Sequence, residues 1–202
     1  MFKIAITGKA NSGKNTIGKL LVKGLDALEC AANGAPNDFH YKNHFIAFAD
    51  PLKEIARITF PEIPRKWLYG PSKFRAEVIP GAFKEGVPLT VRQLLCDLGN
   101  DYGRRYQSDR WVRVFDSRVK KLRDVHILVV TDVRFRNEFD HLKQQGFYQI
   151  RLLRDSHLKI NDISETNQDG IQDSEFDFVL RNNSTLKDLK VEVAKIVQIL
   201  RS

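Results

Sequence analysis

The residues that most directly indicate chemistry are 8-GKANSGKNT-16, which follow a short apolar run and precede a helical pattern. Their spacing, Gly-x-x-x-x-Gly-Lys, is that of a loop that binds phosphate groups. Gly8 and Gly13 allow the backbone to curl, so that successive N–H groups and the positive end of the next helix face one point. Lys14 adds a full charge there. A basic loop that merely joins a strand to a helix is the alternative, but the flanking elements favour nucleotide phosphate binding.

Asn15 departs from this pattern, because Ser or Thr normally follows the lysine and offers a hydroxyl group to Mg²⁺. An asparagine side chain offers a neutral amide oxygen, which is a hard donor without charge. We therefore expect Mg²⁺ to be bound mainly by phosphates and water, with Asn15 as a direct or water-mediated ligand. Thr16 remains available for a phosphate oxygen.

A second set of charged residues lies in 131-TDVRFRNEF-139, at the end of the most apolar segment of the chain. Asp132 at the carboxyl end of a parallel strand suits coordination of Mg²⁺ or orientation of a substrate, although it could instead cap the next helix. Arg134 could bind a phosphate with its planar guanidinium group. A surface ion pair between Arg134 and Glu138 is the alternative.

The middle of the chain mixes basic and aromatic residues, in 65-RKWLYGPSKFRAE-77 and 92-RQLLCDLGNDYGRRYQSDRWV-112. Three interpretations stay open: a pocket for a base and a phosphate, an aromatic and basic nucleic-acid surface, or amphipathic helices with solvent-exposed arginines. Lys53, in 48-FADPLKEI-55, is expected one turn into a helix that starts beside the carboxyl edge of the sheet.

Apolar runs and helical periodicity predict an α/β fold with a doubly wound parallel sheet. The expected strands are 3–7, 44–50, 125–132, 148–153 and 176–180. The expected helices of the core are 14–29, 135–145 and 184–200. Residues 51–123 are expected to form a helical insert without strands, with helices at 51–59, 89–98 and 108–122 that start near Thr90 and Ser108. The core would thus comprise residues 1–50 and 124–202 of a single domain, and the polar residues 155–175 are expected to form a lid loop.

Composition narrows the class of protein. The 202 residues are 42% hydrophobic and 29% charged, as in ordinary globular proteins, and no segment is long and apolar enough to cross a membrane. The N-terminus lacks a signal-peptide pattern, and Cys30 and Cys96 are expected to be free thiols in the cytoplasm. The net charge of +8 favours anionic partners, either phosphates or nucleic acid.

Six segments in order resemble the phage-type deoxynucleoside monophosphate kinases, which belong to the P-loop nucleoside monophosphate kinase superfamily. They are 8-GKANSGKNT-16, 48-FADPLK-53, 98-LGNDYGR-104, 109-DRWV-112, 132-DVRFRNE-138 and 162-DISE-165. The closing 177-DFVLRNNSTLKDL-189 resembles the segment against which the adenine of ATP lies in many such kinases. The position after the loop lysine is commonly Asp in that family, so Asn15 departs there too.

The resemblance implies a kinase that uses ATP and Mg²⁺ to phosphorylate a deoxynucleoside monophosphate. Asn11, Ser12, Gly13, Lys14, Asn15 and Thr16 would bind the ATP phosphates. The monophosphate substrate would contact Lys53, Arg75, Arg92, Gly99, Asn100, Trp111, Asp132, Arg134 and Glu138. Lys14, Asp132 and Arg134 would be catalytic, and Arg154 or Lys159 would be brought in by the lid.

Two rival functions also fit parts of the sequence. A phosphomevalonate-kinase-like enzyme has a similar loop and Asp-x-Arg segment, and a nucleic-acid-binding ATPase would use the positive charge. Neither a recognition helix nor a basic arm is present in the sequence, which disfavours nucleic acid. The resemblance is compatible with a homodimer, and no membrane partner is expected.

Overall fold

The computed structural model describes residues 1–34, 42–155 and 167–201. These residues form two compact units: the core unit, Met1–Ala47 with Leu122–Ser202, and the insert unit, Phe48–Lys121. None of the helices described is both long and apolar enough to span a bilayer. Cys30 and Cys96 are both free thiols. The expected loop residues 156–166, which include Lys159, lie outside the described residues.

A five-stranded sheet in which all pairs are parallel forms the centre of the core unit. Its strands, in spatial order, are β2 (Asn43–Ile46), β5 (Ile127–Val133), β1 (Phe2–Thr7), β6 (Tyr148–Leu153) and β7 (Phe178–Arg181). The central strands are apolar on both faces, and Ile4, Ala5, Ile6 and Val129 have no exposed surface. Strands of this kind require helices on both sides of the sheet.

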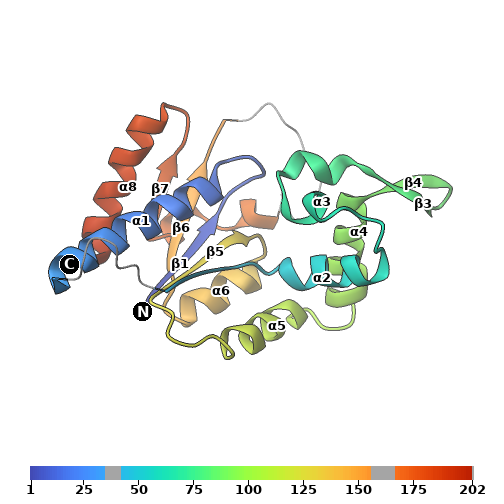
Figure 1. The fold of residues 1–202 in the computed structure, drawn as a ribbon, viewed down its shortest axis with the longest axis horizontal. Coiled ribbons are helices and arrows are strands. Elements are labelled where there is room, and N and C mark those ends of the chain that lie inside the picture. Colours follow the sequence, from blue (N-terminus) through green and yellow to red (C-terminus); the bar gives the residue numbers. More distant parts are fainter. Residues whose placement is uncertain (35–41, 156–166, 202) are drawn as a thin grey trace. The chain divides into compact units, whose positions relative to one another are not determined.

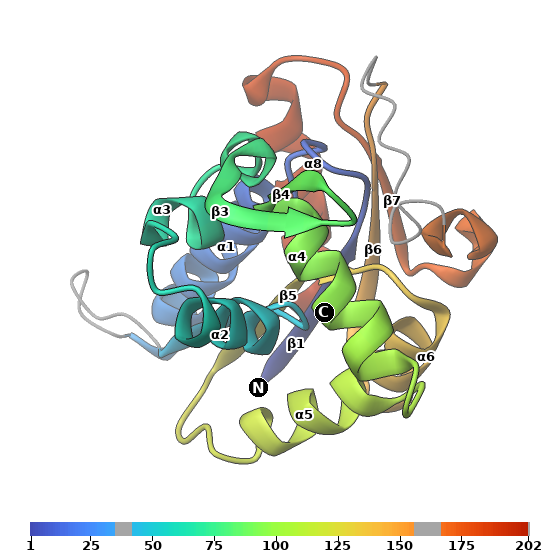
Figure 2. The same ribbon diagram turned by 90° about the vertical axis from the view of Figure 1, so that its right-hand side faces the viewer.

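Among the described residues, three helices of the core unit cover the sheet. They are α1 (Lys14–Asn33), α6 (Arg136–Gln144) and α8 (Leu186–Arg201). The connection from β1 to β2 and that from β5 to β6 run in opposite directions along the sheet, so right-handed crossovers place α1 and α6 on opposite faces (Figure 2). Helices α1 and α8 lie side by side (Figure 1), and Gly24 of α1 packs against Val197 of α8. The predicted doubly wound α/β fold is confirmed.

Several predicted boundaries of strands, helices and loops are wrong. The second strand ends at Ile46, and Asp50 begins a helix instead of ending the strand. The last strand begins at Phe178, two residues later than expected. The segment expected to be an irregular lid contains two short 3₁₀ helices, η3 (Asn167–Gly170) and η4 (Asp173–Glu175).

The insert unit is mostly helical, but it also contains a β-hairpin. Its elements are α2 (Asp50–Thr59), α3 (Arg65–Tyr69), the 3₁₀ helix η1 (Ser72–Ala76), β3 (Val78–Lys84), β4 (Val87–Thr90), α4 (Val91–Asp97), the π-helix η2 (Leu98–Arg104) and α5 (Arg110–Val119). Figure 2 shows the hairpin leading directly into α4. The capping box of α4, formed by Thr90 and Gln93, confirms the predicted helix start at Thr90. The helix expected from Ser108 begins at Arg110 instead.

The prediction that the insert has no strand is wrong for a physical reason. Pro80 and Pro88 cannot donate to a strand ladder, and they obscured the strand pattern, but a two-stranded hairpin tolerates proline on its free edges. The turn between the strands consists of Glu85 and Gly86, with φ angles of 51° and 79°. Two consecutive positive φ angles are typical of the tight turns that match the twist of a hairpin.

Candidate active site

The phosphate-loop residues 8–13 leave β1 and lead into α1 as predicted. Gly13 caps α1 in the left-handed region, with φ 103°, and Asn11 also has a positive φ angle, 61°. The first turn of α1 contains no acidic residue, so its N–H groups and positive dipole end are not neutralised locally. The Lys14 ammonium group lies over the loop and donates to the carbonyl oxygens of Gly8 and Lys9, the latter at 2.7 Å.

The phosphate loop packs closely against β6 and contains an unpartnered buried hydroxyl group. A Cβ atom at Gly8 would lie 2.6 Å from the Leu152 carbonyl oxygen, so the backbone can pass there only as glycine. The side chain of Ser12 is 2% exposed, and its hydroxyl oxygen has no hydrogen-bond partner among the residues described. A buried polar atom of this kind at a glycine-rich loop is consistent with a ligand oxygen as its partner.

Two charged residues from other segments, Arg154 and Asp169, contact the phosphate loop. Arg154, which follows β6, donates from Nη1 to the Asn11 carbonyl oxygen at 3.3 Å. Lys9 forms an exposed ion pair with Asp169 of η3, with 3.2 Å between Nζ and Oδ2. The Arg154 guanidinium group therefore lies beside the phosphate loop, where sequence reasoning expected a cation from the lid.

The carboxyl end of β5 pairs irregularly with the end of β1, the strand that leads into the phosphate loop. Thr7, the last residue of β1, pairs with Val133. The preceding pair is Ala5 with Val130. Between these two pairs, β1 has one residue, Ile6, whereas β5 has two, Thr131 and Asp132. A bulge of this kind redirects a side chain and is common beside active sites. Asp132 is therefore part of a bulged strand end, and the N-terminal cap of α6 is Phe135.

Glu138 stabilises the start of α6. Its side chain is 2% exposed, and Oε2 accepts hydrogen bonds from the backbone N–H groups of Arg134 at 2.9 Å and Phe135 at 3.2 Å. A carboxylate at the third helical position commonly binds back to the N-terminal backbone in this way. Glu138 thus holds the backbone of Arg134 at the carboxyl edge of the sheet.

In the insert unit, Lys53 is half-buried and already compensated in charge. Its ammonium group lies 2.9 Å from Asp50 Oδ1 and 5.5 Å from the centre of the Tyr69 ring. Arg75 of η1 donates from Nη2 to the Leu68 carbonyl oxygen at 3.0 Å. These contacts pre-position two of the cations expected to bind the substrate phosphate.

A bidentate ion pair joins α2 to α5 within the same unit. The two terminal nitrogens of Arg118 lie 2.8 and 2.9 Å from the carboxylate oxygens of Glu54. The hydrogen bonds that Arg118 donates to Glu54 raise the pKa of Arg118. This pair stabilises the helical frame that carries Lys53.

The π-helix η2 carries Gly99 and Asn100, and Trp111 of α5 holds it in place. The indole N–H of Trp111 donates to the Gly99 carbonyl oxygen at 2.8 Å, and the ring is only 5% exposed. A Cβ atom at Gly103 would overlap the same ring. Turns with π-helical hydrogen bonds are frequent at functional sites, and sequence periodicity did not indicate this one. Arg92 lies in the first turn of α4.

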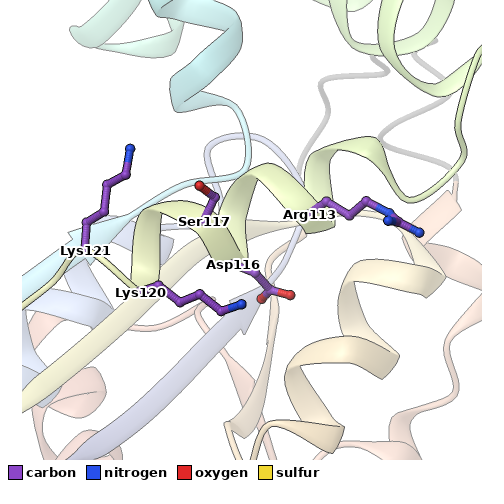
Figure 3. A pocket seen from close by; sticks show the side chains of 5 residues that line it. All are labelled: Arg113, Asp116, Ser117, Lys120 and Lys121. Atoms are coloured by element: carbon purple, nitrogen blue, oxygen red, sulfur yellow. The ribbon is translucent and has the colours of Figure 1, made fainter.

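A pocket of about 470 Å³ is lined by Arg113, Asp116, Ser117, Lys120 and Lys121 of the insert unit. None of the expected site residues lines it. Figure 3 shows that the side chains of Arg113 and Lys121 point in different directions, while Lys120 and Asp116 approach each other. Because its cations do not converge, this pocket does not provide a phosphate site.

Comparisons with known proteins bear on the family. The chain matches the family model of deoxynucleotide monophosphate kinases over residues 73–193, which is more than half of its 202 residues. No curated protein matches it. Among solved structures, it is similar to a gluconokinase from Sinorhizobium meliloti 1021, with 15% identity, a TM-score of 0.45, and coverage of 98% of this chain and 93% of that chain. The family match covers the π-helix, the bulged end of β5 and the loop after β7, and the chain therefore belongs to the deoxynucleotide monophosphate kinase family.

Proposed function

We propose that this chain transfers the γ-phosphoryl group of ATP to a deoxynucleoside 5'-monophosphate, which yields ADP and the deoxynucleoside diphosphate, through the residue roles given below. The observation that supports these roles most directly is that the phosphate loop begins next to the bulged end of β5. The chain is also a member of this kinase family. Nothing in the structure or the comparisons favours a phosphomevalonate-kinase-like enzyme or a nucleic-acid-binding ATPase.

The chemistry of the acceptor phosphate determines which catalytic groups the protein must supply. The attacking atom is an oxygen of a phosphate group that is already ionised at neutral pH, so the reaction needs no strong general base. Catalysis then consists of positioning the two phosphate groups and neutralising the charge on the transferred phosphoryl group.

The core unit would bind the donor. Asn11, Ser12, Gly13, Lys14, Asn15 and Thr16 would surround the ATP phosphates. Lys14 would exchange its hydrogen bonds to the carbonyl groups of Gly8 and Lys9 for the β- and γ-phosphates. Bound Mg²⁺ would neutralise charge on these phosphates, with the Asn15 amide as a direct or water-mediated ligand. Asp132 would orient the acceptor or a metal-bound water, and Arg134, whose backbone is held by Glu138, would bind the acceptor phosphate.

The insert unit would bind the acceptor. Lys53, Arg75 and Arg92 supply positive charge for its phosphate, and Gly99 and Asn100 of the π-helix would contact the nucleoside. Trp111 would support this pocket indirectly, because its buried indole N–H donates a hydrogen bond to the Gly99 carbonyl oxygen. The aromatic side chains near Lys53 suit a nucleobase better than an isoprenoid acid.

Residues 155–175 would limit the access of water, because an open site would hydrolyse ATP. The described end of this segment is anchored, since Arg136 of α6 lies 2.8 Å from Glu175 of η4. Arg154 would be the cation nearest the transferred group. Magnesium as the metal, the cytoplasm as the location and a homodimer as the assembly are parts of the same proposal.

The first experiment mixes the purified protein with ATP, Mg²⁺ and dAMP, dGMP, dCMP or dTMP, each in a separate reaction. ADP formation is measured against a control without acceptor. Acceptor-dependent ADP with at least one monophosphate supports the proposal and gives the base preference. Intact ATP with all four would overturn the proposed acceptor, and phosphorylated acids would be tested next.

Lys14→Ala tests the role of the phosphate loop. Because the variant loses the charge that neutralises the donor phosphates, we expect transfer to fall by roughly 100-fold or more. Its melting temperature should stay close to that of the wild type. Lys19→Ala changes an exposed lysine of the same helix and serves as the control. Wild-type turnover of Lys14→Ala would contradict the proposed mechanism.

A further inference from the structure

In the loop after β7, the side chain of Asn182 contacts the phosphate loop. Its Nδ2 atom donates a hydrogen bond of 2.7 Å to the Ser12 carbonyl oxygen. Its backbone N–H donates to the Leu153 carbonyl oxygen at 2.8 Å. Asn182 is therefore fixed at the carboxyl end of β6 while its amide group reaches the phosphate loop.

This hydrogen bond determines how one peptide group of the phosphate loop is oriented. No peptide bond in the described chain is cis, so the C=O of Ser12 and the N–H of Gly13 point in opposite directions. With the carbonyl oxygen held by Asn182, the Gly13 N–H is directed away from that side chain. Gly13 directly precedes the first helical residue, Lys14, so this N–H belongs to the set that surrounds a phosphate at the start of α1.

Close packing prevents the peptide from turning. A Cβ atom at Gly13 would lie 2.7 Å from Asn182 Nδ2, so the amide lies directly against the backbone of the glycine. The φ angle of Gly13, 103°, is also one that residues with a side chain rarely adopt. The glycine is thus required both by its own conformation and by the position of Asn182.

We propose that Asn182 is a positioning residue of the phosphate loop, which orients the Ser12–Gly13 peptide so that the Gly13 N–H faces the bound phosphate. The proposal rests on the proposed function in that the loop binds nucleotide phosphates. A pre-oriented donor strengthens phosphate binding because the protein does not have to reorganise when the ligand arrives.

The neighbouring Asn183 provides a matched control. Its Nδ2 donates to Asp155 Oδ2 at 2.7 Å, and its Oδ1 accepts from the Asp155 backbone N–H at 2.8 Å. Asn183 thus joins the same two strand ends, but its hydrogen bonds go to Asp155 and not to the phosphate loop. Asn183→Ala removes two side-chain hydrogen bonds, one more than Asn182→Ala, without altering the Ser12–Gly13 peptide.

The affinities of each variant for ADP and for adenosine show whether Asn182 acts on the phosphates or on the base, because only ADP carries phosphate groups. Loss of one hydrogen bond predicts that Asn182→Ala binds ADP roughly tenfold more weakly, with adenosine binding unchanged. Asn182→Asp should lose more, because a carboxylate repels both the Ser12 carbonyl oxygen and the phosphates. Asn183→Ala should bind ADP within about twofold of the wild type, since its contacts lie elsewhere. Equal losses for ADP and adenosine would overturn the proposal.

A second measurement needs no nucleotide. Amide hydrogen exchange of the peptide that contains residues 8–16 is compared between the unliganded wild type, Asn182→Ala and Asn183→Ala. Faster exchange of this peptide in Asn182→Ala alone supports the positioning role. Unchanged exchange would overturn it even if the protein phosphorylates monophosphates. If the wild type bound no nucleotide, the proposed function would fail while the exchange result still decided the role of Asn182.

Discussion

Replacing Glu138 with alanine separates two roles for this residue, substrate binding and helix capping. The resemblance to nucleotide kinases places Glu138 at the substrate, whereas the structure shows its carboxylate bound to the backbone N–H groups of Arg134 and Phe135. If capping is the main role, Glu138→Ala should lower stability first. Turnover should then fall because Arg134 is no longer held in place.

The magnitude follows from the two hydrogen bonds and the burial. A hydrogen bond to a charged group contributes about 1.5–3 kcal/mol, and loss of an N-terminal helix cap costs about 0.5–2 kcal/mol. Because both bonds end on one carboxylate that is 2% exposed, we expect a total loss of about 2–3 kcal/mol. For a chain of this size, that corresponds to a decrease in melting temperature of roughly 4–12 °C. Glu138→Gln keeps an acceptor oxygen without the charge and should show about half of this decrease.

The assay combines thermal unfolding with steady-state kinetics at a temperature where all variants are folded. Glu192→Ala is the control, because Glu192 forms an exposed ion pair with Lys195 at 2.7 Å, and such pairs contribute at most about 1 kcal/mol. The capping role predicts a lower melting temperature and a lower kcat for Glu138→Ala, with the KM for ATP unchanged. A wild-type melting temperature combined with a raised KM for the monophosphate alone would refute the reasoning and assign Glu138 to the substrate.

Two further predictions concern the insert unit and the acid range. Gly103→Ala places a methyl group against the Trp111 indole and should destabilise the protein by about 1–3 kcal/mol, which thermal unfolding and tryptophan fluorescence would detect. A wild-type melting temperature would contradict the close packing at η2. The Gln172 backbone N–H and then Arg136 lower the pKa of Glu175. Its stabilising contribution is therefore complete above the usual carboxyl pKa and disappears as the pH falls through the lowered value. Glu175→Gln should thus make the melting temperature less dependent on pH in that acidic range, and an identical pH profile would contradict this linkage.

The features that were predicted correctly from the sequence each depend on residues that are close together in the chain. The phosphate loop, from Gly8 to Thr16, is recognisable because its glycines and lysine act within nine consecutive residues. The capping box at Thr90 depends on a partner only three residues away. Long apolar runs indicated the central strands because burial on both faces leaves no polar position. In each case the physical requirement is local in the chain.

Features of the site that depend on pairing across the chain could be decided only by the tertiary structure. The bulge at Asp132 exists relative to β1, more than 100 residues earlier, and no spacing within β5 indicates it. The sequence suggested substrate binding or a surface ion pair with Arg134 for Glu138, and the structure shows a buried carboxylate that also binds the backbone N–H groups of Arg134 and Phe135. Asn182 lies 170 positions from Ser12, and Trp111 contacts a π-helix that has no sequence periodicity. The sequence by itself thus determined which local elements form and where phosphate can bind. The tertiary structure decided which side chains orient those elements, because hydrogen bonds and close contacts between distant segments arise only when the chain is folded.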